Sequence, residues 1–343
     1  MMNFRIGKKF QSKPKNKLGL DMGSSSIKLL EIEVNNDKFL LSRIGFKKVS
    51  GTSHDILAGA VKSLIEESNI VSKEVNISVT GPSSIVRFVS MPKMRDEELK
   101  SAIKFEAEKY IPFAINDCIV DFQVLKKNDK EGKLDVLLVA VKKELVLNRI
   151  AIAEGCGLGV GVVDVDSFAV TNSFLKNFGQ LLSDKTAALL NIGSALTNVS
   201  IVRDGALCFS RDVSIGGADF SAEISKSLNV DLALAEEIKI SPGDKLEDII
   251  RFTKTAVNNL LDEMKLSFSY YENQSGRGID EIYISGGAAE LPGLGAAFQE
   301  AFESKPFLWD PLKFLDASGL SANKELAGNM SRSFAVAAGL AIR

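Results

Sequence analysis

The sequence predicts an α/β fold of two similar halves, each a mixed sheet with packed helices, and a smaller α/β unit inserted in the first half. Residues 18–33 have the pattern of two strands around a Gly/Ser turn, and the same pattern returns at 187–202. A further hairpin strand follows each copy, so we interpret the chain as an internal duplication. Between the two copies, residues 83–158 form a pattern of their own, strand–helix–strand–strand–helix.

The first half is expected to open with strands, because apolar and polar residues alternate there with a period of two. The expected elements are two strands in 18–33, a strand at 39–44, a helix at 56–68 and a strand at 75–80. His54 is the only histidine of the chain and directly precedes that helix. We interpret it as a helix-start residue rather than a catalytic base or a zinc ligand.

The insert is expected to contain strands at 85–89, 119–125 and 134–141 and helices at 96–110 and 144–154. Asp96 is the expected N-cap of the first of these helices. The glycine-rich run at 155–161 resembles a dinucleotide loop, but it follows a helix and precedes a strand. Because that order is the reverse of a dinucleotide motif, we interpret the run as a helix C-cap.

The rest of the chain continues both halves. The expected elements are a strand at 160–165, a helix at 167–178, strands in 187–202, at 206–213 and at 281–285, and a helix at 293–302. The expected domains are a basic tail at 1–17, a first subdomain at 18–82 plus 159–182, the insert at 83–158, a second subdomain at 183–216 plus 278–343, and a mainly helical small subdomain at 217–277.

Composition excludes several classes of protein. The 343 residues carry 42 Lys and Arg against 44 Asp and Glu, so no overall basic field favours nucleic acid. Apolar runs are too short to span a bilayer, and the polar first 17 residues contain no signal-peptide core. Three widely spaced cysteines indicate a reducing compartment.

The Gly/Ser turns carry the chemistry that the residues themselves indicate. Gly23, Ser24, Ser25 and Ser26 would present backbone N–H groups and hydroxyls to an anion, and Lys28 lies close by. Asp21 precedes the turn, where it could hold a water of a phosphate-bound Mg²⁺. One such turn is common in proteins, but two at equivalent positions facing a cleft form a clamp around a polyphosphate.

Two further glycine pairs end strands before helices. Gly286 and Gly287 follow the strand at 281–285 and would let a flat ring lie on the backbone. The alternative is a strand–helix turn that needs small residues for packing. Gly216 and Gly217 end a strand in a similar way.

These motifs together resemble a known superfamily. LGLDMGSSSIKLLEI, ALLNIGSALTNVSIV, SIGGADFS and EIYISGGAAELPGLGAAFQEAF occur in the order of the nucleotide motifs of the actin–Hsp70–sugar kinase superfamily. VVDVDSFAVTNSF and SFAVAAGLAI resemble its two connecting motifs. FEAEKYIPFAINDCIVDFQVL at 105–125 resembles the insert of the PilM family of type IV pilus assembly proteins. The resemblance implies an actin-like, ribonuclease H-like fold of duplicated βββαβα domains with an FtsA-type inserted α/β subdomain.

The resemblance also implies ATP and Mg²⁺ as ligands. Its phosphate loops fall on Gly23, Ser24, Ser25, Ser26 and Lys28 and on Gly193, Ser194 and Thr197, and its adenosine contacts on Gly216, Gly217, Glu236, Lys239, Gly286 and Gly287. For Glu236 and Lys239 the alternative is a solvated charged helix face. Asn191 stands where the ATP-hydrolysing relatives have Asp, and we identified no water-orienting base. ATP binding is therefore better supported than hydrolysis, and we assign no catalytic residue.

A partner site is implied in the same way. In the PilM family a groove beside the insert holds the N-terminal cytoplasmic segment of PilN, a bitopic membrane protein. Tyr110, Ile111, Pro112 and Phe113 are the expected groove wall, and the alternative is a helix stop with core aromatics.

The sequence therefore predicts a cytoplasmic ATP-binding adaptor, peripheral at the inner face of the cytoplasmic membrane. It is expected to contact a PilN-like protein and other pilus platform proteins, with self-association possible and without binding nucleic acid. The alternative is a filament-forming actin-like cytoskeletal ATPase of the FtsA or MreB type. A small-molecule kinase of the superfamily would need a sugar-binding carboxylate, which we did not find.

Overall fold

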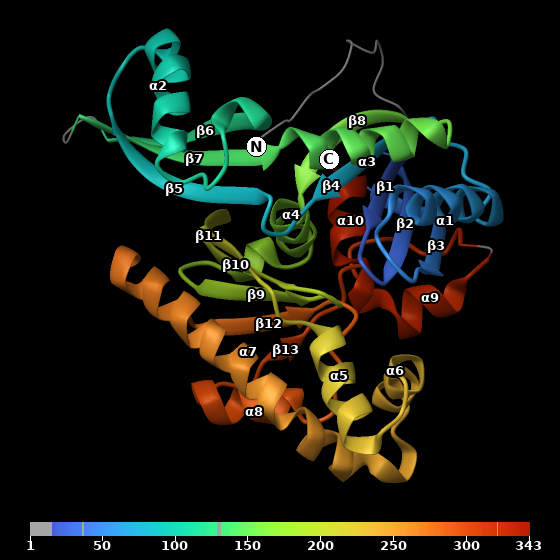
Figure 1. Cartoon of the computed structure of the whole chain (residues 1–343). Coiled ribbons are helices and arrows are strands. Elements are labelled where there is room, and N and C mark those ends of the chain that lie inside the picture. Colours follow the sequence, from blue (N-terminus) through green and yellow to red (C-terminus); the bar gives the residue numbers. More distant parts are fainter. Residues whose placement is uncertain (1–15, 36–37, 129–131, 321) are drawn as a thin grey trace.

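A computed structural model of the chain describes residues 16–35, 38–128, 132–320 and 322–343 (Figure 1). Residues 1–15 of the expected basic tail, which was predicted to span 1–17, lie outside the described residues. Its last two residues instead begin the first strand, in which Lys17 donates a 2.8 Å hydrogen bond to the carbonyl of Arg343.

Two five-stranded sheets share one topology. The first has the order β3-β2-β1-β4-β8, and the second has the order β11-β10-β9-β12-β13. In each, a three-stranded antiparallel meander is extended by two strands parallel to its first strand. The strands are β1 Asn16–Met22, β2 Ser26–Asn35, β3 Lys38–Lys48, β4 Glu74–Val79 and β8 Gly159–Val165, then β9 Thr186–Ile192, β10 Thr197–Arg203, β11 Ala206–Val213, β12 Glu281–Ser285 and β13 Phe307–Leu308. The duplicated α/β fold is confirmed.

Helices α1 (His54–Glu67) and α3 (Lys143–Gly155) cover the first sheet. Leu57, Val61 and Leu64 recur every three or four residues of α1 and are buried against this sheet. His54 begins α1 as expected, and its Nδ1 lies 2.8 Å from Oδ1 of Asn148 on α3. Thus α3, which falls within the expected insert at 83–158, packs with the first half.

The insert is built on a third sheet of order β5-β7-β6. Its strands are β5 Ser84–Pro92, β6 Cys118–Asn128 and β7 Lys133–Lys142, and α2 (Asp96–Glu108) packs on one face. Alternate residues of β7 meet the apolar stripe of α2, which is the period-two pattern of a strand covered on that face. The expected N-cap of α2 was wrong: the cap is Arg95, whose backbone N–H donates to the Glu98 carboxylate at 3.1 Å.

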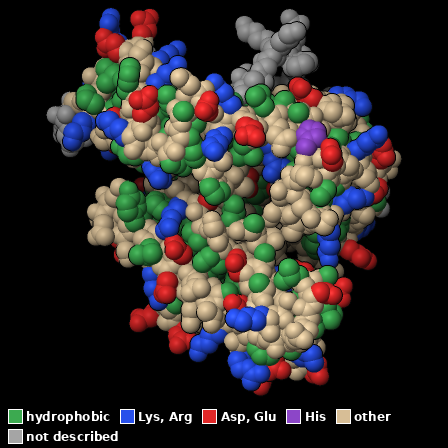
Figure 2. Space-filling model, in the orientation of Figure 1, with side chains coloured by type: hydrophobic (Ala, Val, Ile, Leu, Met, Phe, Trp, Pro, Cys, Tyr) green, Lys and Arg blue, Asp and Glu red, His purple; other side chains and the backbone are tan. Residues whose placement is uncertain are grey.

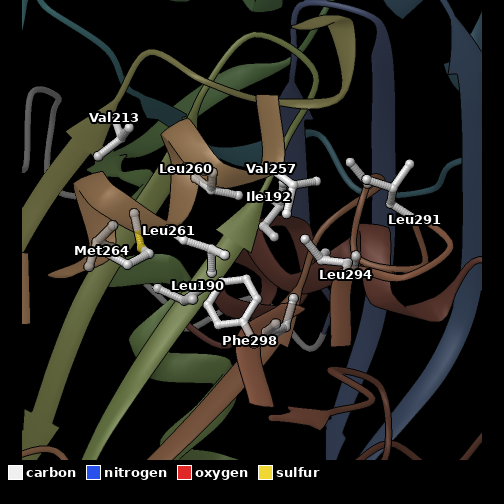
Figure 3. Close-up of a cluster of buried hydrophobic side chains, with 14 of the residues drawn as sticks. Leu190, Ile192, Val213, Val257, Leu260, Leu261, Met264, Leu291, Leu294 and Phe298 are labelled. Atoms are coloured by element: carbon white, nitrogen blue, oxygen red, sulfur yellow. The ribbon is translucent and has the colours of Figure 1, made fainter. Parts of the chain in front are cut away.

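The second sheet carries a helical cluster on one face. It comprises α5 (Gly217–Leu228), α6 (Leu232–Ile240), α8 (Leu294–Phe302) and the 30-residue α7 (Leu246–Ser275). Figure 3 shows Leu190 and Ile192 of β9 packed against Leu260 and Leu261 of α7. Burial of this many aliphatic side chains fixes the sheet beneath α7.

Helices α4 (Asp166–Phe178) and α10 (Ala335–Ala341) cross between the halves, and a short helix, α9 (Lys324–Asn329), precedes the second of them (Figure 1). Contact at the crossing is so close that a Cβ on Gly339 would lie 1.7 Å from the carbonyl oxygen of Ala169. The crossing therefore requires glycine. Over the described residues, no helix combines the length and the hydropathy that crossing a membrane needs.

Candidate functional site

Two glycine turns of the same geometry face one cleft. The N–H of Gly23 donates to the carbonyl of Ser26 at 3.1 Å, and the N–H of Gly193 donates to the carbonyl of Leu196 at 2.9 Å. A Cβ on either glycine would lie under 3.0 Å from the carbonyl that its N–H contacts, so both turns require glycine. The turns at Gly23 and Gly193, which the sequence suggested are equivalent, thus have matching hydrogen bonds and the same need for glycine.

The cleft lies between the two halves and has about 650 Å³ of empty space, with open solvent at its mouth included. Its lining from the first half comprises Asp21, Met22, Gly23, Ser24, Ser25, Lys28, Ser78, Thr80, Arg149 and Asp166, and its lining from the second half comprises Asn191, Gly193, Ser194, Ala195, Leu196, Asn198 and Val336. Most of the expected phosphate-loop residues therefore line one space.

Cross-strand pairs beside the two turns differ in charge. Asp21 pairs with Lys28 across β1 and β2, with Nζ 3.2 Å from Oδ2. At the same register in the second half, Asn191 pairs with Asn198, whose Oδ1 accepts a 3.1 Å hydrogen bond from Nδ2 of Asn191. The charged groups that could act on a phosphate or a magnesium ion are therefore contributed by the first half.

Asp166 is a carboxyl group of the cleft that the sequence analysis missed. It begins α4 directly after β8, and burial raises its pKa to about 8, with the negative charges of Asp21 and Asp212 adding to the effect. A hydrogen bond from Ser78 and the charge of Arg149 oppose this rise in pKa. Its position could have been a signal in the sequence, because Asp166 directly follows β8, which runs parallel to β4. The carboxyl ends of parallel strands lie at the same edge of a sheet, where ligands often bind.

Asp212 joins the two halves at the edge of the cleft. Its carboxylate accepts hydrogen bonds from Thr80 Oγ1 at 3.0 Å, from the Gly81 N–H at 2.7 Å and from Asn198 Nδ2 at 2.6 Å. Because β4 leads into Thr80 and Gly81 while Asp212 lies on β11, these bonds hold the halves together.

The four glycines expected to border adenosine lie beyond the second turn. Gly217 donates to the carbonyl of Gly193 at 2.8 Å, and a Cβ on Gly216 would lie 2.5 Å from the carbonyl oxygen of Ser194. Gly286 has a φ of +98° and abuts the β9 backbone, so close packing alone explains it. In front of Gly287, by contrast, the space is open.

Lys239 of α6 is buried, with 7% of its surface exposed, which excludes the solvated-face alternative for this residue. Its Nζ donates to the carbonyl of Gly217 and to Ser221 Oγ, both at 2.9 Å, and to the Glu236 carboxylate at 2.6 Å. Lys239, paired with Glu236, therefore connects α6 to the start of α5 by hydrogen bonds.

The expected partner residues do not share one surface. Ile111 is buried in the core of the insert, whereas Tyr110 and Pro112 are exposed. Phe113 is half-buried, with the Lys142 ammonium 4.6 Å from its ring centroid. The alternative of a helix stop with core side chains thus describes Ile111.

A second groove lies between β5 of the insert and β11 of the second half, where Figure 2 shows the surface hollowed. Arg87 and Arg211 line it together with small polar residues. Elsewhere on this face basic and acidic side chains are interspersed, as expected from the nearly balanced composition.

Among the described residues, no three His, Cys, Asp or Glu side chains cluster in a way that could hold a metal ion. Magnesium in nucleotide sites is usually held by one or two carboxylates, phosphates and water. Asp21 and Asp166 therefore fit a magnesium ion that arrives with a phosphate.

Two sheets of one topology, joined by crossing helices and facing each other through paired glycine turns, define the actin-like ATPase fold. Comparison with known families is more specific. The sequence model of the family described as type IV pilus assembly protein PilM matches residues 19–343, so the chain belongs to the PilM family. This confirms the resemblance seen in the sequence.

Solved structures agree with this assignment. A structure of the PilM-PilN type IV pilus biogenesis complex is similar with a TM-score of 0.85 and 26% identity, covering 95% of this chain and 98% of that one. MreB5 of Spiroplasma citri bound to AMPPNP matches with a TM-score of 0.52 and 12% identity over 96% of each chain, which shows the fold alone. Among curated proteins, cell division protein FtsA of Staphylococcus epidermidis is 22% identical over 351 residues, 86% of this chain and 74% of FtsA.

Proposed function

We propose that this chain binds ATP with Mg²⁺ in the cleft and acts as an adaptor in type IV pilus assembly. The observation that carries the nucleotide part is the pair of glycine turns with matching hydrogen bonds that line the same space. Such turns offer backbone N–H groups to phosphate oxygens from two sides.

Each side of the cleft has a role in this proposal. Ser24 and Ser25 of the first turn and Ser194 of the second line the cleft and would add hydroxyl donors to the backbone N–H groups. Ser26 and Thr197 are buried and do not line it, and Thr197 Oγ1 donates to the carbonyl of Ile215 at 2.8 Å. Lys28 would supply positive charge, and Asp21 would hold the magnesium ion through a water. The chemistry that Mg²⁺ contributes is neutralisation of the phosphate charge.

The adenosine would lie beyond the second turn, over the open space in front of Gly287. Gly216, Gly217 and Gly286 shape that border, and the Glu236–Lys239 pair holds α6 beside it. The proposal concerns binding and does not include a rate of hydrolysis.

The partner part of the proposal rests on family membership and on the similar PilM-PilN complex. The expected ligand is the N-terminal cytoplasmic peptide of a PilN-like bitopic protein, which would bring this chain to the inner face of the cytoplasmic membrane. Tyr110, Pro112 and Phe113 present apolar surface just after the end of α2. Other platform proteins and self-association belong to the same proposal.

A filament-forming ATPase is the second candidate, favoured by the FtsA relatives and by the MreB-like fold. Sedimentation with Mg·ATP separates the candidates, because a filament pellets and an adaptor stays in the supernatant.

Calorimetry with Mg·ATP tests the nucleotide site. Ser25 is exposed at the tip of the first turn, so Ser25→Glu should fold normally and repel the phosphates. We expect at least about a tenfold loss of affinity, ~1.4 kcal/mol. Ser269→Glu, on the exposed face of α7, is the matched control and should bind as the wild type does. Equal affinity in the wild type and Ser25→Glu would refute the assignment.

A further inference from the structure

Arg149 reaches the cleft from an unexpected element. It lies on α3, the helix that directly follows the central strand of the insert, and yet its side chain lines the same space as Asp21, Lys28 and Asp166. No motif in the sequence marked it.

The guanidinium of Arg149 lacks hydrogen-bond partners for two of its nitrogens. Among the described residues, none accepts from its Nε or its Nη1, although both atoms are shielded from the surface. Burial lowers the pKa of this guanidinium, and the charges of Asp166 and Asp21 only partly offset that effect. A buried cation without partners is costly, so this geometry is expected where a ligand completes it.

A phosphate group fits this gap. The planar fork of a guanidinium matches two phosphate oxygens, and charge-assisted hydrogen bonds of this kind are among the strongest in proteins. A nucleotide phosphate held by the first turn, beside Lys28, would be within the same lined space.

The layout of the cleft indicates which part of the nucleotide Arg149 would contact. Gly217 is bonded to Gly193 of the second turn and Ala288 to Ile192 of β9, so the segments that would border adenosine pack on the second half. Arg149 belongs to the first half and lines the cleft together with Asp21. A nucleotide that spans both turns would therefore point its terminal phosphate at Arg149.

We propose that Arg149 binds the terminal phosphate of ATP and that α3 thereby couples the cleft to the insert. The inference rests on the proposed nucleotide site. Coupling is direct because β7 ends at Lys142 and α3 begins at Lys143, with no loop between them. The same helix packs on α1, where Oδ1 of Asn148 lies 2.8 Å from Nδ1 of His54.

Calorimetry with ATP and with ADP, each with Mg²⁺, tests the contact. Arg149→Met keeps the length of the side chain and removes the fork, and it should lower the ATP affinity at least tenfold and the ADP affinity less than threefold. Arg149→Lys should lie between the wild type and Arg149→Met. Arg87→Met, an exposed arginine outside the cleft, should leave both affinities unchanged.

A second readout separates binding from folding and coupling. Two nitrogens of the Arg149 guanidinium lack hydrogen-bond partners among the described residues, so Arg149→Met without nucleotide should still unfold cooperatively, with a midpoint close to that of the wild type. ATP should change hydrogen–deuterium exchange in 84–92 and 133–142 of the wild-type insert, and this response should be absent in Arg149→Met.

The outcomes are distinct. A wild type that binds neither nucleotide would overturn the proposed function and this inference with it. If the wild type binds ATP and Arg149→Met binds it equally well, or loses ATP and ADP to the same extent, the inference alone is overturned. An unchanged exchange response in Arg149→Met would overturn the coupling.

Discussion

Asp166 should make the stability of the ligand-free protein depend on pH in an unusual direction. Its pKa is raised to about 8 in the folded state from the ordinary value of 3.8, first by burial and then by the charges of Asp21 and Asp212, while the hydrogen bond from Ser78 and the charge of Arg149 oppose the rise. Between these two pKa values the folded state holds a proton that the unfolded state has lost. The contribution of this proton to the free energy of unfolding is fully present below the pKa of Asp166 in the unfolded state. It is lost as the pH rises through the pKa of Asp166 in the folded state.

The magnitude follows from the size of the shift. Over the range in which only the folded state is protonated, each pH unit lowers the free energy of unfolding by roughly 1 kcal/mol, which amounts to on the order of 2–3 kcal/mol between pH 5 and 7. Asp166→Asn keeps a neutral side chain of the same shape and cannot lose the proton. The difference between the variant and the wild type should therefore grow by about that amount across the range.

Urea unfolding at pH 5, 6 and 7, in EDTA and without nucleotide, measures this difference. Asp204→Asn is the matched control, because Asp204 lies in an exposed turn with a φ of +50°, which Asn tolerates well. Its curve should run parallel to that of the wild type. Parallel curves for the wild type and Asp166→Asn would refute the reasoning, since Asp166 would then titrate alike in the folded and unfolded states.

Two further perturbations test the partner surface and the crossing of the halves. Phe113→Ala should weaken binding of a PilN-like N-terminal peptide roughly tenfold or more, through the loss of aromatic burial, in a fluorescence anisotropy titration. Phe105→Ala, the same change at an exposed site on α2, should have little effect, and equal affinity for both variants and the wild type would contradict the surface. Gly339→Ala should destabilise the protein by at least about 3 kcal/mol in thermal unfolding, because its Cβ would lie 1.7 Å from the Ala169 carbonyl oxygen. Gly59→Ala in α1, where nothing lies within 4 Å of a Cβ, should be neutral or stabilising, and equal stability of the two variants would argue against close contact at the crossing.

Periodicity and glycine placement were enough to predict the two halves. Strands with period two and turns that require Gly23 and Gly193 are local properties, so both glycine turns could be found without any tertiary information. The register then placed Asp21 and Asn191 at equivalent positions, as the aligned motifs had suggested.

The residues that the sequence did not reveal are those that only tertiary packing brings to the cleft. Arg149 arrives on α3, a helix that the linear pattern assigned to the insert and that packs on the first sheet instead. Asp212 lies near the end of β11 and reaches the cleft where the two halves meet. Asp166 follows the end of β8, whose place beside β4 in the first sheet the linear pattern did not fix. The N-cap of α2 is Arg95, one residue before the expected Asp96, and the Glu98 carboxylate accepts a hydrogen bond from the Arg95 backbone N–H.

A crystal structure of the chain with Mg²⁺ and a non-hydrolysable ATP analogue would test the central claim most directly. The account predicts phosphates between the turn at 23–26 and the turn at 193–197, within hydrogen-bonding distance of backbone N–H groups from both. It further predicts the terminal phosphate beside Arg149 and the purine near Gly287. A nucleotide bound elsewhere, or held by only one of the two turns, would contradict it.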